Sequence, residues 1–196
     1  MDKLHIELGK DQGLFFTSDL HFGHRNVIKF CNRPWQHEKE MNSGLIDNWN
    51  SVVGNNDIVF VLGDTFWFND SQSIKRVISK LNGKDIYVLP GNHDDFSSWY
   101  RIDDPRIHLC SDTVVLWLKF EGRKKIFEIW MNHYPLMTWP HREGGSIQLF
   151  GHIHSQEGKY DGVDQDLPLH KNQIDVGCDR WGWKPISIED IMVKLT

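Results

Sequence analysis

Short apolar runs recur along the chain, and each is the right length for a buried β-strand. Phenylalanine, valine and isoleucine dominate these runs, which fits strands rather than short helices. They occupy residues 14–18, 58–62, 86–89, 126–131 and 147–150. Residues 114–120 form a further run, joined to 126–131 through a Glu-Gly-Arg turn, and this pattern predicts a β-hairpin.

Helical periodicity appears between the first three strands. Apolar residues between 41 and 53 recur every one or two turns, and those between 74 and 81 follow the i, i+3, i+4, i+7 spacing. Ser71 or Ser73 is predicted to cap the second helix, and Gly83 to end it. Alternating strands and helices indicate a parallel sheet.

The second half of the chain is richer in strands. Strands are expected near residues 148 and 175, and Ser187 begins a capping box that opens a last helix. We therefore predict an α/β protein with two packed sheets flanked by helices. The whole chain, 1–196, is expected to form a single domain with no inserted cap.

Polar motifs follow the strands in a fixed order. Since side chains at strand carboxyl ends meet at one edge of a sheet, these motifs are expected to form one cluster. They are Asp19-Leu20-His21, Gly63-Asp64, Gly91-Asn92-His93-Asp94, His133 and Gly151-His152-Ile153-His154. Each motif alone is weak evidence; five in this order at strand ends are specific.

Composition narrows the classes of function. The formal charge is −5, from 22 basic and 27 acidic residues, and no basic run marks a protein that binds duplex DNA. The three cysteines have neither zinc-finger spacing nor a disulfide pattern, which fits a reducing cytoplasm. No apolar stretch has the roughly 20 residues needed to span a membrane. We expect a soluble cytoplasmic protein, for which small nucleic-acid substrates stay possible.

The donor set indicates divalent transition metals. Carboxylate, imidazole and carboxamide ligands together suit Mn, Fe, Ni or Zn, and we expect two ions, with Mn first. Asp64 is the natural bridge, because each carboxylate oxygen can bind one ion. Two ions in such a site polarise a phosphoryl oxygen and hold a hydroxide for attack. We therefore expect a small phosphorylated substrate, and nucleotides are included.

The order of motifs between residues 19 and 154 resembles the calcineurin-like metallophosphoesterase superfamily, in particular its small members without a cap. The resemblance implies a four-layer αββα sandwich of two mixed β-sheets. It also implies a ligand set, which we list by ion: Asp19, His21, Asp64 and His154 for one, and Asp64, Asn92, His133 and His152 for the other. Asp64 and His93 are the implied catalytic residues, with His93 protonating the leaving group.

One position departs from some relatives. Protein phosphatases of this superfamily carry an acid three residues after the Gly-Asp aspartate, where it orients the catalytic histidine. Trp67 occupies that position here, and Asp94 or Asp95 is the alternative. This favours a phosphodiesterase or an enzyme of small organic phosphates over a phosphoprotein phosphatase.

Further residues are candidates for substrate binding. His24 and Arg25 follow the first motif and are expected to open a helix, while Arg142 lies on a loop before the last motif.

Two other functions stay open: a non-catalytic scaffold that binds proteins, and a nuclease acting on short single-stranded nucleic acid. Loss of ligands would mark the scaffold, and here every ligand position is filled.

Overall fold

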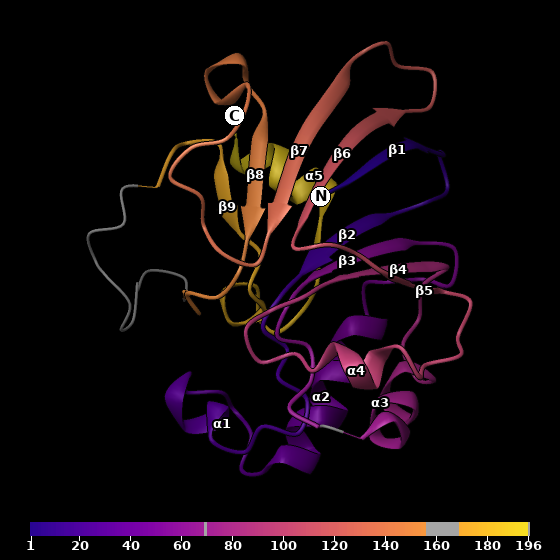
Figure 1. The fold of residues 1–196 in the computed structure, drawn as a ribbon, viewed down its shortest axis with the longest axis vertical. Coiled ribbons are helices and arrows are strands. Elements are labelled where there is room, and N and C mark those ends of the chain that lie inside the picture. The colour runs from indigo at the N-terminus through magenta and orange to yellow at the C-terminus, as the bar shows by residue number, and fades with distance from the viewer. Residues whose placement is uncertain (69, 156–168, 196) are drawn as a thin grey trace.

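The computed structural model of the protein describes residues 1–68, 70–155 and 169–195. These residues form two five-stranded sheets that pack face to face (Figure 1). Sheet 1 has the order β10 (Ile186–Ser187), β2 (Leu14–Thr17), β3 (Ile58–Leu62), β4 (Asp85–Leu89) and β5 (Ile107–Leu109). Sheet 2 has the order β1 (Asp2–Leu8), β6 (Thr113–Phe120), β7 (Ile126–Asn132), β8 (Ile147–Phe150) and β9 (Gln173–Asp175).

Both sheets are mixed. In sheet 1, β2 to β5 run parallel and β10 is antiparallel to β2. In sheet 2, β6 and β7 form the predicted antiparallel hairpin, whereas the pairs β1–β6, β7–β8 and β8–β9 are parallel. The predicted α/β class and the sandwich of two mixed sheets are confirmed.

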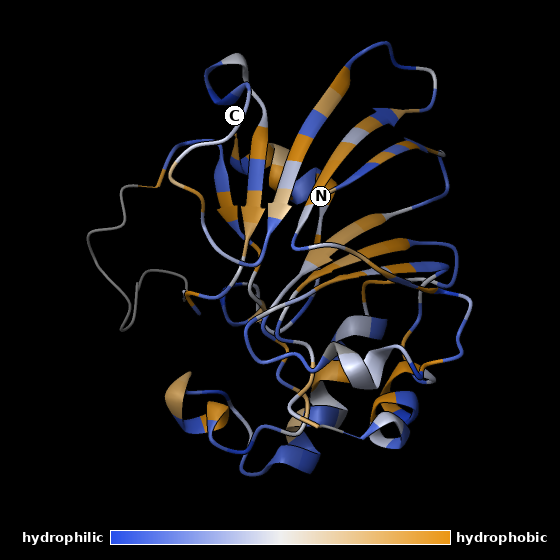
Figure 2. Ribbon diagram, in the orientation of Figure 1, coloured by the Kyte–Doolittle hydropathy of each residue, from blue (hydrophilic) through white to orange (hydrophobic). Residues whose placement is uncertain are grey.

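The core between the sheets explains the apolar runs. All five residues of β3 are buried, because Phe60 faces sheet 2 while Val59 and Val61 face the helices. Strands covered on both faces become continuous apolar runs. In sheet 2, β6 and β7 carry polar residues among the apolar ones, and Figure 2 shows these bands beside the more uniformly apolar β3.

Helices cover the outer face of sheet 1. They are α1 (Val27–Phe30), α2 (Glu38–Asn50), α3 (Ser71–Ile78) and α4 (Phe96–Trp99). Helix α2 packs through Met41, Leu45 and Trp49, the periodic positions of the sequence. Helix α5 (Ile188–Lys194) lies beside β10 and β2, and Ile188 and Ile191 enter the core between the sheets. In the part of the chain described, no helix has the length and apolar content to cross a membrane.

Helix ends confirm one capping prediction and correct another. Ser187 caps α5, accepting a hydrogen bond from the Asp190 N–H at 3.1 Å. The N-cap of α3 is Asp70, which accepts from the Ser73 N–H at 2.8 Å, so the prediction of Ser71 or Ser73 was wrong. That helix ends at Ile78, before Gly83, since the chain turns there to enter β4.

Candidate metal centre

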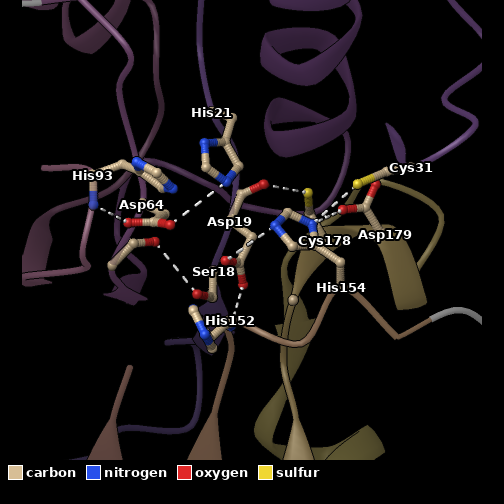
Figure 3. A network of polar contacts seen from close by, with 12 residues as sticks. Ser18, Asp19, His21, Cys31, Asp64, His93, His152, His154, Cys178 and Asp179 are labelled. Carbon is tan, nitrogen blue, oxygen red and sulfur yellow. Dashed lines mark hydrogen bonds and ion pairs between the residues drawn. The ribbon is translucent and has the colours of Figure 1, made fainter. Parts of the chain in front are cut away.

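The predicted ligands come together where strands of both sheets end. Asp19 follows β2, Asp64 follows β3 and Asn92 follows β4, all from sheet 1. His133 follows β7 and His152 follows β8, both from sheet 2. In Figure 3, Asp19 and Asp64 lie near the middle of the site, with His21, His152 and His154 around them.

A left-handed backbone places many of these side chains. Among the described residues, eight that are not glycine have positive φ, and five of the eight are predicted ligands. The five are Asp19 (57°), His21 (52°), Asp64 (52°), His152 (72°) and His154 (47°). Each such residue costs about 1–2 kcal/mol relative to right-handed backbone, and strain of this kind gathers at functional sites.

The first group of ligands surrounds Asp19. His154 Nε2 lies 3.7 Å from Asp19 Oδ1, and His21 Nε2 lies 3.6 Å from Asp64 Oδ2. The His21 and His154 rings stack with centroids 5.2 Å apart. Asp19 Oδ1 is buried and accepts no hydrogen bond from the described residues. A cation held between these nitrogens and oxygens would satisfy that orphaned carboxylate oxygen, so the donors fit a metal ion.

The second group surrounds His133. Its Nδ1 donates to the Leu62 carbonyl oxygen at 2.8 Å, so Nε2 is the ring nitrogen that faces the site. This Nε2 is 3.5 Å from Asp64 Oδ2 and 3.0 Å from Asn92 Oδ1. The His152 ring lies edge-on to His133, with centroids 5.1 Å apart. A neutral imidazole fixed this way presents its lone pair to a metal.

Asp64 joins the two groups through one oxygen. Its Oδ2 faces both His21 and His133, while Oδ1 accepts the His93 N–H at 2.9 Å. The sequence suggested that each oxygen would take one ion; the peptide hydrogen bond to Oδ1 instead leaves Oδ2 directed at both imidazoles. Burial raises the pKa of Asp64, but the His133 imidazole and the His93 N–H outweigh it and lower the pKa to about 2. The carboxylate is therefore ionised.

Glycines in the motifs allow the loops to approach closely. A Cβ on Gly91 would lie 2.1 Å from Asp64 Oδ1, and one on Gly151 would lie 2.0 Å from Ser18 Oγ. A side chain at position 91 is excluded because its Cβ would also lie 2.3 Å from the Asp64 backbone nitrogen, whereas a Cβ on Gly151 would force the Ser18 and Asp19 side chains to shift. The Gly-Asn and Gly-His pairs thus have a packing cause.

Behind His154 lies a buried network that sequence reasoning missed (Figure 3). His154 Nδ1 is 2.8 Å from Asp179 Oδ2 and 3.3 Å from the Cys31 sulfur. Arg33 donates to both Asp179 oxygens, at 2.8 and 2.9 Å, and to the Asp19 carbonyl at 2.7 Å. Asp179 follows β9, so it could have been found by the pattern that picked out the predicted ligands, a polar residue after a strand. No such pattern points to Arg33.

Burial and the charges in this network set the pKa values of the imidazoles. Burial lowers the pKa of His21 to about 2, helped by the neighbouring His154, so His21 is neutral. Burial would also lower the pKa of His154, but the hydrogen bond to Asp179 and the Asp19 carboxylate raise it to about 11. In the absence of metal, a proton on His154 therefore balances the buried carboxylates.

The predicted general acid, His93, lies at the exposed side of the site. Its ring centroid is 5.7 Å from that of His21 and 5.0 Å from that of Trp67. Asp94 accepts the N–H groups of Asp64 and Gly91, at 2.7 and 3.0 Å. Asp94 therefore fixes the loop around Asp64, and an aromatic ring, not a carboxylate, packs on His93.

The three candidate substrate residues differ in position. His24 lies beside the site, stacked on Trp67 with ring centroids 3.8 Å apart and 5.4 Å from the His21 ring. Arg25 is exposed just before α1, which begins only at Val27. Arg142 pairs with Glu143 and donates to the Met137 carbonyl, at 2.8 and 3.1 Å, so these contacts hold it on its own loop.

The family follows from comparison of this chain with known proteins. The model of the family described as calcineurin-like phosphoesterase matches residues 14–170, which include every predicted ligand. The chain belongs to this family. Membership indicates metal-dependent phosphoester hydrolysis, and the clusters of Asp and His described above agree with binding of divalent metals.

Relatives of this calcineurin-like phosphoesterase extend over nearly its whole length. The uncharacterized protein MJ1445 of Methanocaldococcus jannaschii is 32% identical over 93% of this chain and 90% of its own. The Gene 66 protein of Mycobacterium phage D29 is 28% identical over 86% of this chain and 88% of its own. A crystal structure of a protein of unknown function, AQ665 from Aquifex aeolicus, matches with TM-score 0.66 at 23% identity, covering 93% and 99% of the two chains. That likeness supports the fold.

Proposed function

We propose that the protein hydrolyses phosphodiesters, or small organic and nucleotide phosphates, with two divalent ions, Mn first, at the centre described above. The observation that carries the proposal is the position of Asp64 Oδ2, 3.6 Å from His21 Nε2 and 3.5 Å from His133 Nε2. A carboxylate that faces two separate imidazole groups is one that two ions could share.

The residues would divide between the ions as the resemblance implies. Asp19, His21 and His154 would hold one ion, Asn92, His133 and His152 the other, with Asp64 shared. When bound, such ions polarise the phosphoryl oxygens and supply a hydroxide nucleophile at neutral pH. The site's two carboxylates, Asp19 and Asp64, offset only half of the charge of two divalent ions, so the loaded centre attracts a phosphate anion.

His93 is proposed to protonate the leaving oxygen. Its peptide N–H is tied to Asp64, while its ring lies exposed beside Trp67 and His21. An imidazole in this position would lie next to a phosphate held at the centre and would be open to the leaving group. A positioned general acid contributes about 10²–10⁴-fold to the rate, and more for a poor leaving group.

The direct test loads purified protein with Mn²⁺ and measures hydrolysis of a bis-nitrophenyl diester, a nitrophenyl monoester, 2′,3′- and 3′,5′-cyclic nucleotides and short oligonucleotides. We expect the diester to be cleaved faster than the monoester, and two ions per chain by elemental analysis. Asp64→Asn should lose at least one ion and nearly all activity. Asp85→Asn, at the other end of β4 where Asp85 contacts His108 at 2.8 Å, is the matched control and should keep both.

Two results would redirect the proposal. Two bound ions with no hydrolysis of any substrate would favour the non-catalytic scaffold, and a clear preference for oligonucleotides would favour the nuclease. His93→Ala tests the acid: it should keep both ions, lose activity steeply on alkyl or nucleoside diesters, and lose much less on nitrophenyl esters, whose leaving group needs no proton. Equal losses on both would remove His93 from that role.

A further inference from the structure

One edge of sheet 2 is the seven-residue strand β1, which has a neighbouring strand on one side only. Figure 1 shows β1 as the outermost strand of this sheet, next to β6. No proline or bulge interrupts it, since it pairs with β6 at every position. In the part of the chain that the structure describes, no backbone group bonds to the other side of β1. A long unblocked edge of this kind readily pairs with a further strand.

The pairing with β6 decides which backbone groups of β1 face outward. Leu8 accepts the Glu121 N–H at 2.9 Å, so its backbone faces β6, and the parallel register does not change along the strand. Because the backbone of a strand alternates in direction, every second residue before Leu8 also bonds to β6. The outward N–H and C=O groups therefore belong to Lys3, His5 and Glu7.

The side chains of these three residues suit pairing of β1 with its own copy. All three are exposed. In an antiparallel pair of two β1 strands centred on His5, Lys3 of each copy lies opposite Glu7 of the other, and cross-strand pairs of opposite charge stabilise a sheet. Charges of one sign would repel a second copy, whereas these attract it. The His5 ring stacks on Trp117 of β6, with centroids 4.8 Å apart, and so lies over its own sheet.

The apolar side chains of β1 fit the same register. Leu4 and Ile6 pack against the core between the sheets but are only half-buried. In the pair centred on His5, Leu4 of one copy lies opposite Ile6 of the other. These two residues form a non-hydrogen-bonded pair, in which opposite side chains come closest. Each would cover apolar surface of the other, and such burial favours association.

We propose that the protein forms a two-fold symmetric dimer in which two β1 strands pair antiparallel about His5. The two copies of sheet 2 then become one continuous sheet, held by backbone hydrogen bonds in the manner of strand addition. Because the two-fold axis uses the same edge of both copies, the contact closes at two chains. The proposal is independent of the proposed function, since β1 carries no predicted ligand.

The test begins with sedimentation equilibrium of the full chain from micromolar to millimolar concentration, both with Mn²⁺ and with chelator. We expect a reversible dimer in both conditions. Lys3→Glu and Glu7→Lys each turn both charge pairs into like charges, so each variant alone should dimerise about 10-fold more weakly, or less well still. An equimolar mixture of the two variants should recover the dimer, because every charge then faces its opposite. Lys124→Glu, on the exposed turn between β6 and β7, is the matched control and should dimerise normally.

Amide hydrogen exchange tests the backbone pairing separately. In dilute, monomeric protein, the N–H groups of Leu4 and Ile6 are protected by β6, whereas those of Lys3, His5 and Glu7 exchange freely. As the concentration rises and pairing becomes complete, the second set should slow by about 10-fold or more. His5→Pro removes the central donor but no bond to β6, so it should abolish the dimer.

Four results would overturn the proposal. The chain could stay monomeric at every concentration, or form a dimer that both charge variants leave unchanged, in which case another surface forms it. Variants that lose the dimer but do not recover it on mixing would exclude the antiparallel register. Equal weakening by Lys124→Glu would show a general effect of charge. None of these results bears on hydrolysis, which metal content and activity test separately.

Discussion

Arg33 should be among the most destabilising positions to change in the metal-free protein. Its guanidinium is buried, pairs through two nitrogens with Asp179, and donates to the Asp19 and Leu20 carbonyls at 2.7 and 2.8 Å. Arg33→Met retains most of the volume and removes every donor. The buried Asp179 carboxylate then loses the charge of Arg33 and keeps only the His154 imidazole as a partner, at 2.8 Å.

The expected loss can be set from burial. Removing one partner of a buried ion pair costs about 3–5 kcal/mol, chiefly because the other charge remains uncompensated. For a chain of this size each kcal/mol lowers the melting temperature by about 2–4 °C, so the fall should be about 6–20 °C. Burial raises the pKa of Asp179, but the Arg33 charge outweighs it and lowers the pKa from 3.8 to about 2. The stabilisation is therefore present above pH 3.8 and lost as pH falls through about 2.

Arg106 provides a matched control. It also forms a two-nitrogen pair, with Asp104 at 3.0 and 2.8 Å, and donates to the Leu81 and Ile78 carbonyls at 2.7 and 3.1 Å. Its side chain is 28% exposed, against 0% for Arg33, so burial is the main difference. Arg106→Met should cost only about 1–2 kcal/mol.

The assay is chemical and thermal unfolding in excess chelator, so that bound metal does not contribute. Adding Asp179→Asn to Arg33→Met should recover part of the lost stability, since no buried charge then remains unpaired. The reasoning fails if Arg33→Met costs no more than Arg106→Met. It also fails if the double variant is no more stable than Arg33→Met alone.

Three other changes test the site itself. Asp179→Asn should weaken metal binding about 10- to 100-fold by calorimetry, because the ligand His154 loses its orienting carboxylate; unchanged affinity would deny Asp179 that role. Metal binding should release protons and tighten as pH rises, because the pKa values of His154 and His133 are both raised and the metal must displace their protons. Titrations in buffers of different ionisation enthalpy measure the release, and an absence of release would contradict protonated imidazoles at the centre. Gly91→Ala should abolish metal binding, because the added Cβ would push against Asp64. Gly122→Ala is the control: Gly122 has φ of 75° and no atom within 4 Å of an added Cβ, so this variant should lose about 1–2 kcal/mol of stability and keep the metal. Equal metal affinity in the two variants would refute the close-approach argument.

Strands and the hairpin were predictable because burial imposes a simple pattern on them. A strand covered on both faces, such as β3, must be apolar throughout, and the turn of the β6–β7 hairpin contains Gly122 with φ of 75°. The strand β1 was not predicted, because its exposed positions alternate with half-buried ones and leave no apolar run. Its partner strand, β6, also lies far along the chain. The N-cap of α3 was predicted wrongly because Asp70 and Ser71 are adjacent polar residues that can both cap a helix. Only the fold decides which of them precedes the first turn.

The predicted ligands were chosen by their place at strand ends, and the structure brings them together, whereas no sequence pattern marked the groups that support them. Arg33 acts through the Asp19 and Leu20 carbonyls, and any residue can supply a carbonyl, so no side-chain pattern marks the contact. Asp94 was noticed as a possible partner of His93, yet it accepts peptide N–H groups from the Asp64 loop. Hydrogen bonds to backbone depend on the path of the chain, which the sequence encodes only through the whole fold.

The predicted ligands are divided between the two sheets, so the packing of the sheets assembles the candidate site. Sheet 1 contributes Asp19, Asp64 and Asn92, and sheet 2 contributes His133, His152 and the neighbouring His154. The carboxylates therefore come from one sheet and most imidazoles from the other. Packing of the apolar faces between the sheets brings these two sets to within about 4 Å, as the 3.5 Å separation of Asp64 and His133 shows. The strained left-handed backbone and the buried carboxylate oxygen without a donor both destabilise this arrangement. The apolar core must therefore supply the free energy that holds the site together in the absence of bound cations.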